Sequence, residues 1–217
     1  MLVTQGSPPC ICCVPLNSSQ KKVVWPFIIF SDENKFNLDG LDGYKHYWRD
    51  LRRPLRRDKT RQKGRGSLMV WEAFGYKGKS ELAVLEGRQN SGHYIYTVSE
   101  HLLPFDYKNY GTDLVFMQDN ASIHASYETT SFFEDIGMQL LDWPARSPDL
   151  NPIENVWAIL ARKVYSHDKQ YNFIPDLTAA IMEVWESVTM AELHVLMDSM
   201  PARCFKVACA GGDTISY

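Results

Sequence analysis

Short apolar runs alternate with polar, turn-forming segments along most of this chain, and their lengths predict an α/β fold. Runs of strand length, rich in β-branched and aromatic residues, predict strands at residues 23–30, 35–38, 44–49, 67–76, 80–86, 114–117 and 138–141. Pro26 restricts the first run to a sheet edge or to the start of a strand. Gly78, between two lysines, predicts a hairpin that joins the strands at 67–76 and 80–86.

Helical periodicity dominates the second half of the chain. The sequence predicts a helix over 91–103, with Ser91 as its N-cap and Pro104 as its stop, and an amphipathic helix over 123–136 that ends at Gly137. Three more helices are predicted at residues 151–165, 175–188 and 190–200. Strands that come first, followed by alternating helices and strands, indicate a mixed sheet with helices on its faces.

Composition agrees with one large domain. The chain has 217 residues, of which 45% are hydrophobic, enough for a packed core. No apolar stretch reaches the roughly 18 residues that a membrane-spanning helix needs, so we expect no membrane partner. The odd number of cysteines, five, indicates free thiols in a reducing compartment. Residues 1–22 lack helical periodicity and the pattern of a signal peptide, and we expect a disordered tail there.

The net charge of −3 conceals a strongly basic segment. Between residues 45 and 65, ten of the 23 lysines and arginines stand against two aspartates, so this segment carries +8 and the remainder −11. The basic residues are Lys45, Arg49, Arg52, Arg53, Arg56, Arg57, Lys59, Arg61, Lys63 and Arg65. A solvated loop and a nuclear import signal are two plain interpretations. The position between two predicted core strands favours contact with DNA phosphates.

Three carboxylates stand in settings that suit a metal site. Asp32 follows the apolar run at 23–30, Asp119 follows the run at 114–117, and Glu154 comes after a gap of 34 residues, near the start of a predicted helix. Mg²⁺ prefers hard oxygen ligands in octahedral geometry, and phosphodiester chemistry with two ions about 3.5–4 Å apart needs one bridging carboxylate and others outside. Strands that end in Asp, with a helix beside them, predict such a set.

Each of these residues also has a purely structural interpretation. Asp32 and Asp119 could be turn or cap residues that follow strands. Glu154 could close a capping box in which Asn151 is the N-cap and Pro152 the first helical residue. The two roles of Glu154 do not exclude each other, because the start of a helix near the metals could position the same carboxylate.

Neighbouring residues add candidates for orienting the ligands. We expect Glu33 and Asn120, directly beside two of the acids, to orient them by hydrogen bonds. His124 could orient a water or contact the scissile phosphate, although a structural histidine with satisfied hydrogen bonds is the favoured interpretation. We expect three tryptophans to pack in the core: Trp71, Trp143 and Trp157.

The order of these motifs resembles the catalytic domain of the Tc/mariner transposases, which belong to the DDE group and have an RNase H-like fold. The resemblance covers residues 23–164 and rests on Phe30-Ser-Asp-Glu33, Met69-Val-Trp71, Gln118-Asp-Asn-Ala121 with His124, Trp143-Pro-Ala145 and Ser147-Pro-Asp-Leu-Asn-Pro-Ile-Glu-Asn-Val-Trp157. Glu72 departs from the family pattern, in which a small residue follows Val-Trp. This departure bears on local strand packing more than on chemistry.

The resemblance implies a mixed five-stranded sheet flanked by helices, with a helical C-terminal end, a catalytic domain over 23–217 and a clamp-type basic insertion at about 39–66. It implies that Asp32 and Asp119 hold two Mg²⁺ or Mn²⁺ ions and that Glu154 completes the site. The reaction would be hydrolysis of a phosphodiester at a transposon end, followed by attack of the freed 3′-hydroxyl on target DNA. The implied partners are double-stranded DNA and a second copy of the chain, in the nucleus.

Transposases of this kind carry two helix-turn-helix units ahead of the catalytic domain, and residues 1–22 are too few to contain them. We therefore expect a truncated transposase. The alternative from another functional class is a relic or host-recruited module that binds DNA or dimerises without catalysis. The presence of all three carboxylates favours the enzyme.

Overall fold

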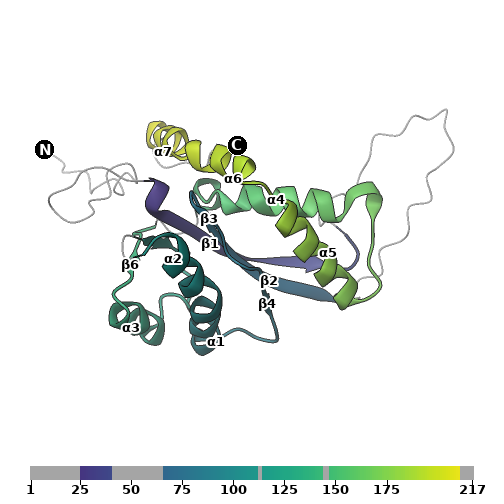
Figure 1. Ribbon diagram of the computed structural model, residues 1–217, viewed down its shortest axis with the longest axis horizontal. Helices are drawn as coiled ribbons and strands as arrows, with labels where there is room; N and C mark the ends of the chain where they lie inside the picture. Colours follow the sequence, from purple (N-terminus) through teal and green to yellow (C-terminus); the bar gives the residue numbers. More distant parts are fainter. Residues whose placement is uncertain (1–24, 41–65, 112–113, 144–146, 211–217) are drawn as a thin grey trace, which may run out of the picture.

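The computed structural model describes residues 25–40, 66–111, 114–143 and 147–210 (Figure 1). The predicted tail at 1–22, with Cys10, Cys12 and Cys13, lies outside the described residues. So does most of the basic insertion, including every lysine and arginine between residues 45 and 65 and the predicted strand at 44–49. The expectations for these segments therefore stay predictions.

A mixed sheet forms the centre of the fold. Its strands are β1 (Ile28–Asn37), β2 (Ser67–Gly75), β3 (Gly78–Lys79), β4 (Ala83–Leu85), β5 (Val115–Met117) and β6 (Gln139–Leu140). The order across the sheet is β3-β2-β1-β5-β6, and β4 also pairs with β2. Strands β1, β2, β3 and β4 pair antiparallel, whereas β5 and β6 run parallel to β1. The predicted mixed sheet is confirmed, and β1 is its middle strand.

The sheet has six strands where five were expected, because one edge position is divided. Strand β3 pairs with Phe74 and Gly75, and β4 pairs with residues 69–71 further along the same edge of β2. Ser80 separates them. Its carbonyl accepts the indole N–H of Trp185 at 2.9 Å, and its hydroxyl oxygen, instead of a carbonyl, accepts the N–H of Ala73 at 3.0 Å. This side-chain bond interrupts the regular ladder.

Strand β1 is longer than the apolar run predicts. A short 3-10 helix, Trp25–Phe27, holds Pro26 just before the strand, as expected of a proline at a strand start. The strand then continues through the polar residues to Asn37, because β2 pairs with it from Ile29 to Asn37 and supplies hydrogen-bond partners throughout. Two predictions were therefore wrong: residues 35–38 are not a separate strand, and Asp32 lies inside β1 and not at its end.

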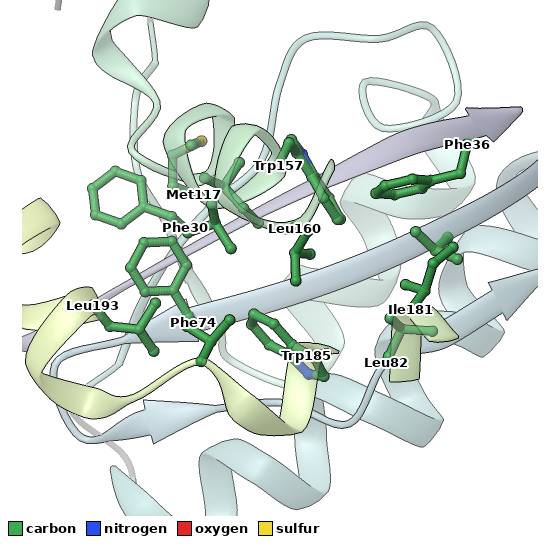
Figure 2. Close-up of a cluster of buried hydrophobic side chains, with 14 of the residues drawn as sticks. Phe30, Phe36, Phe74, Leu82, Met117, Trp157, Leu160, Ile181, Trp185 and Leu193 are labelled. Carbon is green, nitrogen blue, oxygen red and sulfur yellow. The ribbon is translucent and has the colours of Figure 1, made fainter. Parts of the chain in front are cut away.

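Helices cover both faces of the sheet (Figure 1). On one face lie α1 (Ser91–Thr97), the π-helical turn η3 (Val98–Leu102), α2 (Leu103–Asn109) and α3 (Tyr127–Asp135). On the other lie α4 (Ile153–Val164), α5 (Ile174–Ser187), α6 (Met190–Asp198) and α7 (Met200–Cys209). Each layer buries its own apolar cluster, and Figure 2 shows the larger one, between the sheet and α4–α6. None of the helices in the described ranges combines the length and the apolar character that crossing a membrane requires.

The sequence predicted that Pro104 ends the first helix, and this prediction was wrong. The helix begins after Asn90, not Ser91, because the Asn90 side chain accepts the N–H of His93. It then widens into a π-helical turn in which Leu103 donates its N–H to the carbonyl of Val98. This turn restarts the helix so that Pro104 falls in the first turn of α2, where a missing N–H costs little.

The later helices follow the predictions more closely. Helix α3 starts at Tyr127, a few residues late, because Ser126 caps it through the N–H of Thr129. It ends at Asp135, close to Gly137, whose φ of +66° suits a C-terminal glycine. The helix predicted over 190–200 ends at Asp198, and α7 follows as a separate helix.

Glu72, the residue that departs from the family pattern, is fully buried in the middle of β2. Neither of its carboxylate oxygens has a hydrogen-bond partner among the described residues. The nearby Lys79 ammonium donates instead to the carbonyls of Trp185, Glu186 and Val188 at the end of α5. Burial raises the pKa of Glu72 well above its usual 4.5, and the charge of Lys79 only partly opposes this rise. Burial without a hydrogen-bond partner therefore favours the protonated, neutral form of Glu72 in the folded protein.

This burial predicts a specific pH dependence of stability. The native state holds the Glu72 proton above pH 4.5, where the unfolded chain releases it, so stability from this group is present at low pH and is lost as pH rises. Glu72→Gln cannot ionise. The difference in free energy of unfolding between Glu72→Gln and wild type should shift in favour of the variant by up to about 1.4 kcal/mol for each pH unit above pH 4.5.

Urea unfolding at pH 5, 6, 7 and 8 measures this difference. Glu81→Gln, an exposed position in the same hairpin, is the matched control and should keep the wild-type slope. Parallel stability curves for wild type and Glu72→Gln would show that Glu72 is ionised in the fold.

Candidate active site

The parallel pairing of β1 with β5 places two of the three candidate carboxylates at the same level of the sheet. Phe30 of β1 pairs with Met117 of β5, and Asp32 and Asp119 each lie two residues further along their chains. Asp32 is half-buried on the α4 face of β1, and Asp119 is exposed in the loop that follows β5. The two acids therefore come from neighbouring strands that run in the same direction.

Helix α4 brings the third carboxylate to this place. Its buried residues Ile153, Val156, Trp157 and Leu160 form one stripe that packs against the sheet, and α4 contacts β1. Glu154 lies in the first turn of this helix, and its side chain is exposed.

The capping box predicted for Glu154 is not formed. The N–H of Asn151 donates to the carbonyl of Pro148, in the short 3-10 helix Pro148–Leu150, and so it needs no side chain. The Asn151 side chain instead accepts the N–H of Ile153 at 3.3 Å. The Glu154 carboxylate therefore does not serve as a cap.

Electrostatics shows that Asp32 lies in the field of other acids. Burial, followed by the negative charges of Glu154 and Glu33, raises the pKa of Asp32 from 3.8 to about 7. Hydrogen bonds from the Glu33 N–H and the Trp157 indole act in the opposite direction but do not outweigh these effects. Burial also raises the pKa of Glu154. This uncompensated negative charge is the kind of environment that a cation would stabilise.

Asp119 has the opposite surroundings. Its Oδ1 lies 2.5 Å from Nδ1 of His124 and accepts the N–H of Ala121 at 2.9 Å. The bond to His124 is the main reason that the pKa of Asp119 falls below its usual 3.8. These contacts hold one oxygen of Asp119, and Oδ2 has no such partner among the described contacts.

His124 joins Asp119 to Glu33. Its ring is buried, and Nε2 lies 3.3 Å from Oε1 of Glu33, an ion-pair distance without the alignment of a hydrogen bond. Burial alone would lower the pKa of His124, but the two carboxylates outweigh burial and raise it to about 9. His124 is therefore a charged residue between two acids, and its Nε2 lacks the hydrogen bond that a fully satisfied structural histidine would make.

Three further residues contribute to this arrangement and were missed as site residues. Tyr94 packs against the His124 ring at a tilt of 36°, with ring centroids 4.0 Å apart, and donates its hydroxyl to Gln118 at 2.6 Å. The Gln118 amide donates to the His124 carbonyl at 3.3 Å. Trp157 donates its indole N–H to Oδ2 of Asp32 at 3.3 Å. Gln118 and Trp157 carried a sequence signal, because both belong to the motifs around Asp119 and Glu154, whereas Tyr94 carried none.

The remaining predicted residues have structural contacts. Asn120 donates its side-chain amide to the carbonyl of Trp143 at 2.8 Å, which ties the loop after β5 to the end of β6. Trp71 and Trp143 are buried, as predicted. Trp143 packs edge-on against Phe30, with ring centroids 5.9 Å apart.

The carboxylates do not form a complete metal cage. Within the described ranges, no three acidic, histidine or cysteine side chains are already grouped as ligands of one ion. Mg²⁺ does not require such a cage, because it keeps several waters and takes one or two carboxylates together with substrate phosphates. The acids around Asp32, with oxygen donors and unneutralised charge, fit a hard divalent cation in their chemistry.

Comparisons with known proteins identify the family of this chain. The family model described as DDE superfamily endonuclease matches residues 27–178, a range that contains all three carboxylates. The Tc3 transposase of Caenorhabditis elegans is 42% identical over 193 residues, which is 89% of this chain and 59% of that protein. The Tc1 transposase of the same organism is 34% identical over 205 residues, or 89% of this chain and 71% of that protein. The chain thus spans little more than half the length of the Tc3 relative.

Solved structures show the same fold. A Mos1 transposase paired-end complex with the left transposon end matches 89% of this chain and 57% of its own, with a TM-score of 0.77 and 16% identity. A mariner Mos1 paired end complex with Mg matches 90% and 58%, with a TM-score of 0.76 and 16% identity. Likeness at this identity supports the fold alone, and it confirms the predicted RNase H-like class. The family model and the two relatives show that the chain belongs to the DDE superfamily of endonucleases, as a catalytic domain of the Tc/mariner transposases.

Proposed function

We propose that this chain cuts and joins DNA through a divalent-metal site formed by Asp32, Asp119 and Glu154. The observation that carries the proposal is their convergence. Parallel pairing sets Asp32 and Asp119 at one level, and the charge of Glu154 raises the pKa of Asp32 across the β1–α4 contact. The reaction is hydrolysis at a transposon end that frees a 3′-hydroxyl, followed by attack of that hydroxyl on a phosphodiester of target DNA.

The three carboxylates have different proposed roles in metal binding because their surroundings differ. Asp32, half-buried with donors on both oxygens, is a fixed ligand, and Asp119 presents its free Oδ2 while His124 holds Oδ1. Glu154 is exposed at the start of α4, where it can complete the coordination when DNA is bound. Mg²⁺ or Mn²⁺, as a pair of ions, would supply the charge that activates water and stabilises the developing charge on the phosphate. The Mos1 complex with Mg supports the choice of metal.

The proposed substrate is double-stranded DNA. The ten basic residues between Lys45 and Arg65 carry the charge that phosphate contact needs, and the Mos1 complex with a transposon end supports this choice. We also propose, from the family resemblance, that the working unit is a homodimer and that it acts in the nucleus.

Glu154→Gln tests the catalytic proposal directly. The substitution keeps the shape of the side chain but removes a negative charge from the proposed ligand set. Because no capping box depends on Glu154, the free energy of unfolding should change by less than about 1 kcal/mol, the size of a typical cap effect. Mg²⁺-dependent nicking of supercoiled plasmid DNA should be lost.

The matched control is Glu183→Gln, at an exposed position of α5, which should nick as wild type does. Nicking by Glu154→Gln at the wild-type rate would remove Glu154 from the site. A wild-type chain that binds plasmid without any metal-dependent cutting would contradict the enzyme and favour a non-catalytic DNA-binding module.

Asp119→Asn separates metal binding from folding. A ligand that binds only the native state stabilises it by about 2.7 kcal/mol at one hundred times its dissociation constant, so Mg²⁺ or Mn²⁺ should raise the wild-type melting temperature. In Asp119→Asn this rise should shrink. Without metal the variant should be less stable by roughly 1 kcal/mol or less, because it loses a solvent-screened contact with charged His124. An undiminished metal response in thermal melts would exclude Asp119 as a ligand.

A further inference from the structure

Trp157 has a contact that core packing does not require. It lies three residues after Glu154 on α4, about one helical turn, so the two side chains project from adjacent turns of the same side. Its indole N–H reaches Oδ2 of Asp32 at 3.3 Å, across 125 positions of sequence. The same ring packs edge-on against Phe36, with centroids 6.2 Å apart, and Phe36 also belongs to β1. One side chain thus joins the helix of Glu154 to the strand of Asp32.

The Asp32 carboxylate is held from two sides by neutral donors. Oδ1 accepts the backbone N–H of Glu33 at 2.8 Å, and Oδ2 accepts the indole of Trp157. Together these bonds fix the plane of the carboxylate, which has acidic neighbours in Glu33 and Glu154. Each carboxylate oxygen has two lone pairs, so each retains one for another partner. The donors therefore orient Asp32 without occupying it.

Trp185 is a second tryptophan on the same face of the sheet, and it contacts Ser80 and Lys79 but none of the three candidate carboxylates. Like Trp157 it is buried in the cluster of Figure 2, and its indole also donates one hydrogen bond. The acceptor is the Ser80 carbonyl, at 2.9 Å, on the opposite edge of β2 from Asp32. Both tryptophans are buried and each indole donates one hydrogen bond, but the acceptor is the Asp32 carboxylate for Trp157 and a backbone carbonyl for Trp185.

We propose that Trp157 is a positioning residue, which sets the orientation of the Asp32 carboxylate relative to Glu154 for binding of a divalent cation. The inference rests on the metal site proposed above and deepens it. A neutral donor suits this task, because a cationic one would compete with the metal for the carboxylate, whereas an indole N–H adds direction without charge. Hydrogen bonds that orient metal ligands typically change metal affinity by about 10- to 100-fold when removed.

Calorimetric titration of the full chain with Mn²⁺, in the absence of DNA, tests this inference through binding alone. Trp157→Phe keeps an aromatic ring beside Phe36 but removes the N–H, and its Mn²⁺ affinity should fall at least about 10-fold. Trp185→Phe removes the equivalent bond to Ser80 and should keep its affinity within about 2-fold. Benzothienylalanine at position 157, which replaces the N–H by sulfur in a ring of the same shape, should bind as weakly as Trp157→Phe.

The outcomes separate the positioning role from the metal site. Equal affinities for Trp157→Phe and Trp185→Phe, or full affinity with benzothienylalanine, would overturn the role of Trp157 and leave the site intact. If Trp157→Phe does not fold, the benzothienylalanine protein alone decides. Wild type that binds no Mn²⁺, or binds it as Asp32→Asn does, would overturn the metal site and with it this inference.

Discussion

The fold must hold several carboxylates close together although their negative charges repel one another, and the rest of the structure depends on this constraint. Asp32 is half-buried beside Glu154 and Glu33, and burial together with these charges raises its pKa to about 7, which makes its ionised form unfavourable there. Apolar packing supplies the opposing free energy: the stripe on α4 is buried against β1, and the cluster extends to α5 and α6. A cation that binds beside these carboxylates only in the native state would stabilise the folded protein. The apolar packing that stabilises the fold therefore also holds the carboxylates in place for the proposed cation.

The two aspartates meet this constraint by different means. Asp119 is neutralised by the charged His124, which in turn contacts Glu33, so the chain itself carries the countercharge on that side. Asp32 has only the neutral donors of Glu33 and Trp157, so no positive charge of the described chain offsets its own. In the proposed site, a cation would therefore be stabilised most at Asp32. Glu72 pairs with Asp32 across β1 and β2 on the same face of the sheet, and burial there raises its pKa and favours its neutral form.

Much of this could be predicted from sequence, because the signals were local. Apolar runs gave the strands, turn residues gave the hairpin, and Gly137 gave the end of α3. The failures came from long-range or competing interactions. Pairing with β2 carried β1 past its apolar run, a π-helical turn accommodated Pro104, and the carbonyl of Pro148 took the N–H that the capping box needed. The Trp157–Asp32 bond spans 125 positions and has no local pattern.

Asp32, Asp119 and Glu154 are proposed to bind metal together at one site. Anomalous diffraction from crystals grown with Mn²⁺ locates the bound ions without relying on activity. The account predicts anomalous peaks between the end of β5, the middle of β1 and the first turn of α4, in contact with carboxylate oxygens of all three residues. Ordered Mn²⁺ bound elsewhere on the chain, with these three carboxylates free of metal, would contradict it.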